Sequence, residues 1–302
     1  MLLQGAYFFL SLVGLYYGAD LTLESAERVG KSWRLSPLLI GLFLVGFGTS
    51  LPEFFVSQIA CYRGKFDMSL GNVLGSNVAN VFLILGICGL ILPLSLTGNE
   101  LRKQFIFHLV VTAMLGGFLY FGQLNWITLA CSVVYFAVYV YLNLFVGAKD
   151  EDAEKVSVTA KDYLLMIFGF ILLYGSGELL IFSGSKIGGL FGVSEYAISA
   201  IFVAFGTSFP ELVTALLACR RGKGSDLIVG NIIGSNIFNI AFVLGSVGIY
   251  QVKLQSTYTT EFIALAGVSL FFLLMALMKR SMQFFTGIFF LGVYAYFANY
   301  WL

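Results

Sequence analysis

Residues 47–53 read Phe-Gly-Thr-Ser-Leu-Pro-Glu, and residues 205–211 read Phe-Gly-Thr-Ser-Phe-Pro-Glu. Six of these seven positions are identical, at a spacing of 158 residues. A second pair follows, because Gly-Asn-Val-Leu-Gly-Ser-Asn-Val-Ala-Asn over 71–80 recurs as Gly-Asn-Ile-Ile-Gly-Ser-Asn-Ile-Phe-Asn over 230–239. Chance similarity between apolar segments can match Leu with Ile, but it does not reproduce Gly, Thr, Ser, Pro, Glu and Asn in order. The chain therefore contains an internal duplication.

The composition around these motifs is that of a membrane protein. Of the 302 residues, 59% are hydrophobic and 11% are charged, the formal net charge is +1, and the mean hydropathy is +0.91. These values exclude a disordered chain, a basic nucleic-acid-binding protein and a soluble globular enzyme. Long continuous apolar runs favour helices over β-barrel strands, in which apolar and polar residues alternate. The sequence therefore predicts an all-α membrane protein.

About 20 mostly apolar residues are needed to span a bilayer as a helix. Ten segments meet this requirement: 2–19, 37–61, 69–92, 104–122, 125–147, 162–183, 194–219, 226–249, 260–278 and 283–301. A polar connector over 149–161 divides them into halves, 1–148 and 162–302, of five helices each. Because five is odd, the second half enters the membrane from the opposite side, so the duplicated stretches 37–92 and 194–249 form an inverted repeat. Inverted repeats are typical of secondary transporters that bind substrate near the bilayer midplane.

The positive charges predict how the chain is oriented. With ten helices, thirteen of the 17 Lys and Arg residues fall on the side that holds the connector. The positive-inside rule then places the connector in the cytoplasm and both termini outside, in a multi-pass protein of the cell (inner) membrane. Asp20 and its counterpart Glu178 would lie near helix ends, and we interpret them as water-exposed interfacial carboxylates. A role at an ion entrance is the alternative.

Two acidic residues, Glu53 and Glu211, lie near the middle of apolar runs. A charge at that depth costs at least about 2.5–3.5 kcal/mol, so a bound cation, a proton or a watery cavity must offset it. A protonated pair that joins neighbouring helices is the structural alternative. Side chains three or four residues apart share one helix face, and here they all carry oxygen. The candidate ligands are Thr49, Ser50, Glu53, Ser76 and Asn80, with Thr207, Ser208, Glu211, Ser235 and Asn239 in the second half. Ca²⁺ takes six to eight oxygen ligands, and without thiolate or imidazole neighbours neither Zn²⁺ nor Cu⁺ is expected.

Prolines and amides surround the candidate ligands. Pro52 and Pro210 cannot donate to the carbonyls of Gly48 and Gly206, so each predicts a broken helix with exposed carbonyls beside the acid. A simple packing kink is the alternative interpretation. Four asparagines are expected to hydrogen-bond between helices or to the ligands: Asn72, Asn77, Asn231 and Asn236.

Gly-Thr-Ser-Leu-Pro-Glu followed by Gly-Ser-Asn-x-x-Asn resembles the α-repeats of the cation/calcium exchanger superfamily. The resemblance covers essentially the whole chain and is to compact prokaryotic sodium/calcium exchangers. It implies that Na⁺ and Ca²⁺ bind in turn and cross by alternating access, as the long first and sixth helices slide against the other eight. It also implies that Glu53 and Glu211 are the central ligands, with no cofactor, nucleic acid or obligate protein partner. Potassium-dependent members carry Asp where this chain has Asn239, so the resemblance argues against K⁺ co-transport.

Three alternatives stay open at this point. The nearest is a proton/calcium antiporter of the same superfamily, although its Glu after the Gly-Asn pair is replaced here by Val73-Leu74 and Ile232-Ile233. An intramembrane enzyme would need a partner for the single His108, and the second half carries none. A passive cation channel would show no counterflow. Two ionised carboxylates neutralise one Ca²⁺, whereas three Na⁺ bound to the same pair would leave one positive charge. We therefore expect exchange of three Na⁺ for one Ca²⁺ to be electrogenic.

Overall fold

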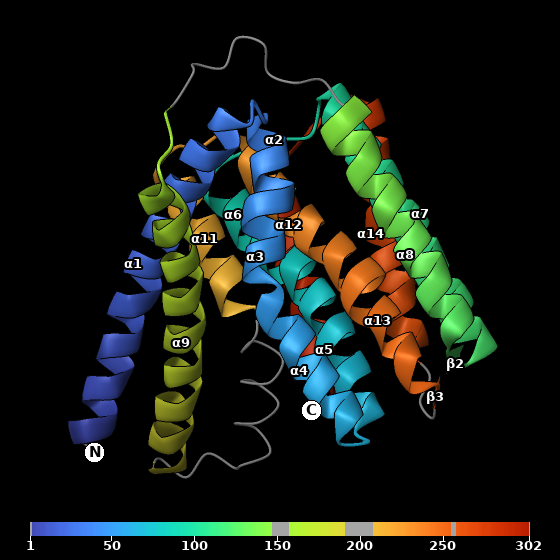
Figure 1. The fold of residues 1–302 in the computed structure, drawn as a ribbon, viewed down its shortest axis with the longest axis horizontal. Helices are drawn as coiled ribbons and strands as arrows, with labels where there is room; N and C mark the ends of the chain where they lie inside the picture. The colour runs from blue at the N-terminus through green and yellow to red at the C-terminus, as the bar shows by residue number, and fades with distance from the viewer. Residues whose placement is uncertain (1, 147–156, 191–207, 255–257, 302) are drawn as a thin grey trace.

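The computed structural model describes residues 2–146, 157–190, 208–254 and 258–301. The fold is helical throughout, apart from two pairs of two-residue strands (Figure 1). The α-helices are α1 (Leu2–Ser32), α2 (Pro37–Leu39), α3 (Phe47–Thr49), α4 (Leu51–Tyr62), α5 (Phe66–Val78), α6 (Leu85–Ile91), α7 (Asn99–Phe121), α8 (Trp126–Tyr141), α9 (Ala160–Leu190), α11 (Phe209–Arg220), α12 (Ser225–Phe238), α13 (Gly245–Val247), α14 (Thr259–Leu277) and α15 (Phe284–Trp301). Four π-helical segments, η1 (Ile40–Gly46), η2 (Ala79–Ile84), η3 (Leu142–Val146) and η4 (Asn239–Leu244), and the 3₁₀ turn η5 (Gly248–Tyr250) continue these helices.

Eight helical stretches in the described part of the chain are long and apolar enough to cross a membrane. They are Leu3–Ser32, Pro37–Tyr62, Phe66–Ile91, Asn99–Phe121, Trp126–Phe145, Ala160–Gly184, Ser225–Tyr250 and Thr259–Leu277. Each overlaps one of the predicted segments. The predicted segment 283–301 is also helical, as α15, but it is not among these eight. Of the predicted segment 194–219, residues 194–207 lie outside the described residues, as do residues 149–156 of the connector.

The ends of α1 and α9 differ from the sequence prediction. The apolar run predicts a first helix that ends at residue 19, whereas α1 continues to Ser32. Asp20 is therefore an internal residue of a long helix. Glu178 is internal as well, because α9 continues to Leu190. The prediction that both residues lie near helix ends is wrong. The Asp20 carboxylate pairs with Arg221, which lies just after α11.

Helices α1 and α9 lie side by side along one flank of the molecule (Figure 1). Glycines allow their backbones to approach closely, because a methyl group on Gly18 would lie 2.8 Å from the backbone nitrogen of Leu173. A methyl group on Gly169 would lie 2.9 Å from the backbone nitrogen of Thr22. Small residues at such positions are how membrane helices reach close packing, since lipid provides no hydrophobic drive between them.

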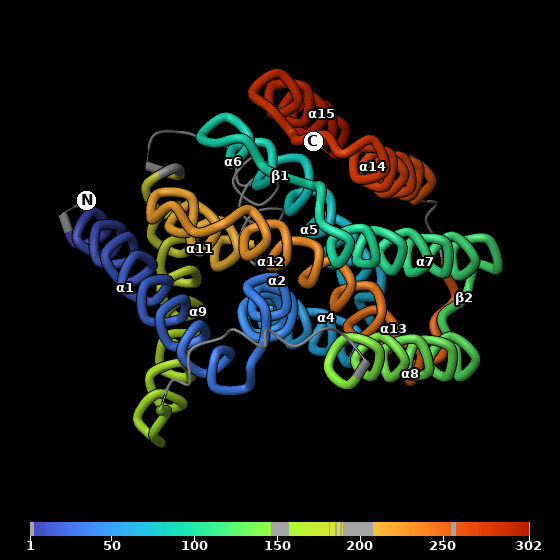
Figure 2. The backbone as a smooth tube through the Cα atoms, turned by 90° about the horizontal axis from the view of Figure 1, so that it is seen from above, coloured from blue at the N-terminus to red at the C-terminus, as the bar shows by residue number. Residues whose placement is uncertain are grey.

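The centre of the bundle is formed by α12 with η1 on one side and α5 on the other (Figure 2). The continuous stretch from α12 to η5 is the most completely buried of the eight candidate spans. Gly230 and Gly234 face the chain at Leu38 and Leu42, where an added methyl group would lie 2.6 and 2.5 Å from carbonyl oxygens. Gly230 and Gly234 thus bring two polar-bearing segments into backbone contact.

Short strands join connections that are distant in sequence. Strand β1 (Leu94–Ser95) pairs antiparallel with β4 (Ser281–Met282), and β2 (Gln123–Leu124) pairs with β3 (Val252–Lys253). These pairings fix helix ends from both halves of the chain against each other. The central helices that carry the repeated motifs are thereby held in register.

Candidate cation-binding site

The first repeated motif breaks a helix at Ser50, two residues before Pro52, and in the second motif a helix begins directly after Ser208. Ser50 separates α3 from α4 with φ −88° and ψ 5°, and Ser208 precedes α11 with φ −89° and ψ 5°. Pro52 and Pro210 then occupy the first turns of α4 and α11, where a missing N–H is tolerated. The helix break predicted beside Glu53 is present, and the residues directly before Ser208 lie outside the described part of the chain. The Gly48 carbonyl, which Pro52 cannot hydrogen-bond, accepts from the Ser50 backbone N–H.

Glu53 and Glu211 occupy the first turns of α4 and α11, and both side chains are fully buried. A helix N-terminus favours a carboxylate because its unpaired N–H groups carry partial positive charge. The Ser50 hydroxyl donates a 2.9 Å hydrogen bond to Oε1 of Glu211. This contact joins the first motif to the acid of the second, and neither acid faces lipid.

The second pair of motifs lies on α5 with η2 and on α12 with η4. Asn80 and Asn239 are buried at the starts of the π-helical segments η2 and η4. Such segments interrupt regular helix pairing and are frequent at functional sites. Ser76 is buried on α5, and Ser235 donates a 3.0 Å hydrogen bond to the Gly46 carbonyl. The Thr49 hydroxyl is also buried and donates to the Val45 carbonyl at 3.1 Å.

Hydrogen bonds from the other asparagines connect neighbouring elements. Asn72 donates to the Glu53 carbonyl at 3.1 Å and to the Ser57 hydroxyl at 3.0 Å. Asn231 donates to the Thr214 hydroxyl at 3.2 Å. Ser57 and Thr214 were not among the sequence-predicted residues, although their positions one turn after each acid could have indicated them.

The remaining amides form a short chain across the centre. Asn80 Nδ2 donates to Asn236 Oδ1 at 3.0 Å, and Asn236 Nδ2 donates to the Asn77 carbonyl at 3.2 Å. The Asn77 side chain instead donates within its own helix, to the Val73 carbonyl at 2.9 Å. Of the predicted site residues, Gly206 and Thr207 lie outside the described residues.

Several buried polar atoms in this region have no hydrogen-bond partner within the described part of the chain. They are Glu211 Oε2, Ser208 Oγ, Asn80 Oδ1 and both amide atoms of Asn239. A buried polar atom without a partner costs about 1–3 kcal/mol, so such a cluster needs a ligand to satisfy it. Among the described residues, no group of three or more His, Cys, Asp or Glu side chains is placed so that it could hold a metal ion. Carboxylate, hydroxyl and amide oxygens are thus the available donors, and this set suits hard cations.

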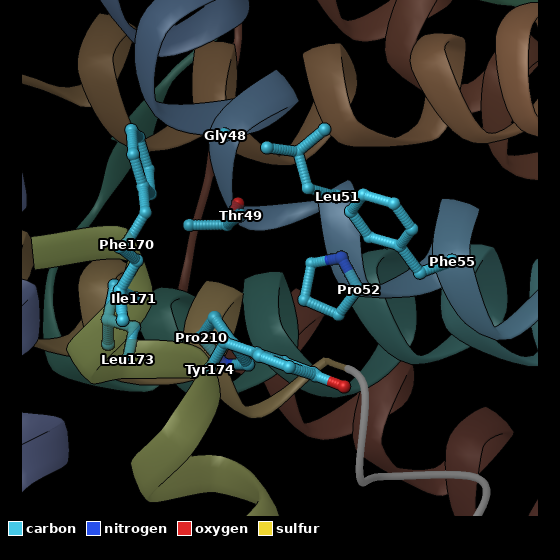
Figure 3. A pocket seen from close by; sticks show the side chains of 10 residues that line it. All are labelled: Gly48, Thr49, Leu51, Pro52, Phe55, Phe170, Ile171, Leu173, Tyr174 and Pro210. Carbon is cyan, nitrogen blue, oxygen red and sulfur yellow. The ribbon is translucent and has the colours of Figure 1, made fainter. Parts of the chain in front are cut away.

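An apolar cavity of about 170 Å³ lies beside the two prolines (Figure 3). Its lining comprises Gly48, Thr49, Leu51, Pro52, Phe55, Phe170, Ile171, Leu173, Tyr174 and Pro210. Phe170 packs against Gly48 so closely that a methyl group there would lie 2.0 Å from Cζ of the ring. Side chains of α9 therefore line this cavity together with Pro52 and Pro210, on the side of the α1–α9 flank.

Comparisons with known proteins identify the family of this site. The sodium/calcium exchanger protein family matches residues 3–145 and 161–301, which is nearly the whole chain. The chain belongs to the sodium/calcium exchanger family. It is accordingly a cation/calcium antiporter of the compact prokaryotic kind and not an enzyme.

Individual relatives agree along most of the exchanger's length. The chain is 33% identical to the inner membrane protein YrbG of Escherichia coli over 258 residues, covering 81% of this chain and 79% of YrbG. It is 27% identical to the sodium/calcium exchanger MaX1 of Methanosarcina acetivorans over 288 residues, covering 80% and 81%. The solved structure of the sodium-calcium exchanger NCX_Mj soaked with Na⁺ and Ca²⁺ superposes with a TM-score of 0.84 at 29% identity, covering 98% of this chain and 97% of that one.

Proposed function

We propose that this exchanger couples the downhill movement of Na⁺ to the uphill movement of Ca²⁺ by alternating access. The observation that carries this proposal is the hydrogen bond from Ser50 to Glu211, because it brings two buried acid-bearing motifs to one place. Two carboxylates match the charge of one Ca²⁺, and hydroxyl and amide oxygens complete its preferred coordination. Relatives named as sodium/calcium exchangers support Na⁺ as the coupling ion.

The proposed cation ligands are those of the duplicated motifs. Glu53 and Glu211 would be the central ligands, and the neutral ligands are Thr49, Ser50, Ser76, Asn80, Thr207, Ser208, Ser235 and Asn239. Their support is burial, together with the unsatisfied oxygens of the described members. Asn239 in place of an acid leaves the site with two charges and favours exchange without K⁺.

The proposed architecture has ten membrane helices in two inverted halves. Ser50 and Ser208 share backbone angles, α4 and α11 each have 12 residues, and η2 and η4 occupy matching motif positions, all of which support the duplication. The family matches the halves as two stretches, 3–145 and 161–301. The excess of Lys and Arg supports a cytoplasmic connector with both termini outside.

Flux measurements test the proposed exchange. Purified protein in proteoliposomes loaded with Na⁺ should take up ⁴⁵Ca²⁺ when an outward Na⁺ gradient is imposed at equal pH on both sides. Glu53→Gln and Glu211→Gln should each abolish uptake, because each removes half of the charge that neutralises Ca²⁺. Glu100→Gln, which alters an exposed carboxylate paired with Lys103, is the matched control and should transport normally.

Two results would contradict the proposal. Uptake that requires a pH gradient and ignores Na⁺ would assign the protein to proton/calcium exchange. Uptake that unlabelled internal Ca²⁺ fails to stimulate, with no dependence on Na⁺, would indicate a passive channel.

A further inference from the structure

The one histidine of the chain is buried at the centre of the bundle, where the proposed ion ligands do not include it. His108 lies on α7 and its side chain has no exposed area. Its Nδ1 is 2.8 Å from the Ser269 hydroxyl on α14, and its Nε2 is 3.5 Å from Nδ2 of Asn236 on α12. The imidazole thus connects two outer helices to the central helix of the site.

Hydrogen-bond accounting fixes the tautomer of this histidine. The Ser269 hydroxyl donates its single hydrogen to the Leu265 carbonyl at 2.6 Å. Ser269 must therefore accept from His108, which places the imidazole proton on Nδ1. In the neutral ring Nε2 is then an acceptor, and it faces the amide nitrogen of Asn236.

The orientation of the Asn236 amide determines that of the Asn80 amide. With Nδ2 directed at His108 and at the Asn77 carbonyl, Asn236 presents Oδ1 to Asn80. Asn80 must therefore donate from its Nδ2, so its own Oδ1 points away from Asn236. That oxygen is buried and has no hydrogen-bond partner among the described residues, which suits a cation ligand.

Only the first half of the exchanger has this arrangement among the described residues. The positions 158 and 159 residues after His108 are Ala266 and Gly267, which offer no acceptor side chain. Asn77, the counterpart of Asn236, donates to its own helix. Asn239, the counterpart of Asn80, has neither amide atom hydrogen-bonded within the described residues. The histidine is thus present in the same half as Asn80, the amide whose orientation is fixed by hydrogen bonds.

We propose that His108 is a positioning residue for the cation site, which acts through Asn236 to hold the carbonyl oxygen of Asn80 toward the bound ion. Without an acceptor at Nε2, Nδ2 of Asn236 keeps only the Asn77 carbonyl as a hydrogen-bond partner, so the amide turns over more readily. Asn80 would then turn its NH₂ group to the cation, which it cannot coordinate. The inference deepens the proposed function and rests on it.

A pair of substitutions separates positioning from simple packing. In His108→Gln the amide oxygen reaches the place of Nε2, whereas in His108→Asn the shorter amide reaches only the place of Nδ1. We expect His108→Asn to raise the Ca²⁺ Kd measured by calorimetry, and the KM of Na⁺-driven uptake, by about 5- to 10-fold, the effect of losing one such interaction. His108→Gln should stay within about twofold of the wild type, and maximal rates should change little. Adding His108→Asn to Asn80→Ala should weaken binding no further than Asn80→Ala alone.

The possible results distinguish a failure of this inference from a failure of the proposed exchange function. Wild-type protein that binds Ca²⁺ but shows no Na⁺-driven uptake would contradict the exchange, while the Kd comparison would still decide the role of His108. Equal Kd values for His108→Asn and wild type, or equal weakening by both substitutions, would overturn the inference. If His108→Asn does not fold, Ser269→Ala takes its place, since it removes the acceptor that fixes the Nδ1 proton. An unchanged Kd in that variant would overturn the inference as well.

Discussion

The hydroxyl of Ser50 lies 2.9 Å from Oε1 of Glu211, across 161 residues of sequence. Ser50 lies at the break between α3 and α4, and Glu211 lies in the first turn of α11. The two acid-bearing motifs therefore meet, and each half contributes an acid near a helix N-terminus. A site built in this way is complete only when both halves are in contact.

Loss of the Ser50 hydroxyl should weaken cation binding without abolishing it. Ser50→Ala removes the donor to Glu211 and a candidate ligand oxygen, while both carboxylates stay in place. A hydrogen bond to a charged group contributes about 1.5–3 kcal/mol, so the KM for Ca²⁺ should rise by at least about tenfold. Ser11→Ala, which removes a buried hydroxyl bonded only to its own helix at Phe8, is the control and should leave the KM unchanged. Equal KM values for Ser50→Ala and wild type would show that Ser50 does not act at the site.

Exchange should respond to membrane voltage. If three Na⁺ leave a vesicle for each Ca²⁺ that enters, one positive charge leaves per cycle, and a potential positive inside should accelerate Ca²⁺ uptake. The driving force changes by about 2.3 kcal/mol per 100 mV for one charge. Potentials set by valinomycin and K⁺ gradients, with ⁴⁵Ca²⁺ as the readout, check this expectation. Uptake that is equal at positive and negative potentials would contradict 3:1 exchange.

The sequence indicates the candidate site because its residues violate the local composition. Glu53, Pro52 and Asn80 have no reason to be in apolar runs unless they serve a site, and their recurrence gives the pairing of the halves. The helix break at Ser50 follows directly from Pro52, since proline at that position lacks the N–H that would continue the helix.

Other features depend on contacts that no local pattern encodes. Asp20 has the appearance of a solvated helix end in the sequence, and its contact with Arg221, 201 residues later, cannot be read from spacing. The link from His108 to Asn236 joins helices 128 residues apart, so its partner is invisible to spacing. The π-helical segments that begin at Ala79 and Asn239 likewise depend on packing rather than on a residue signature.

A row of ion pairs ties α1 to the loop after α11. Asp20, Glu24 and Glu27 share one face of α1, and Arg221 contacts the first two, with Nη1 3.7 Å from the Glu24 carboxylate. Lys223 lies 2.7 Å from Glu27. Because α1 is one of the two helices expected to slide, these pairs would hold it in the position seen here.

Reversal of one charge in this row should destabilise the protein, and reversal of both should restore it. Arg221→Asp places like charges together, whereas Asp20→Arg combined with Arg221→Asp recreates the pair. The side chains of Arg221 and Asp20 are only 26% and 24% exposed, against 54% and 37% for Lys103 and Glu100. We therefore expect the pair to contribute about 1 kcal/mol to the free energy of unfolding, the upper end for surface ion pairs. Thermal unfolding in detergent, at low and high salt, measures the loss of stability in Arg221→Asp, with Lys103→Gln as the exposed control. High salt should reduce the difference in melting temperature between Arg221→Asp and wild type, because it screens exposed charges. A double variant no more stable than Arg221→Asp would show that the pairing does not hold α1.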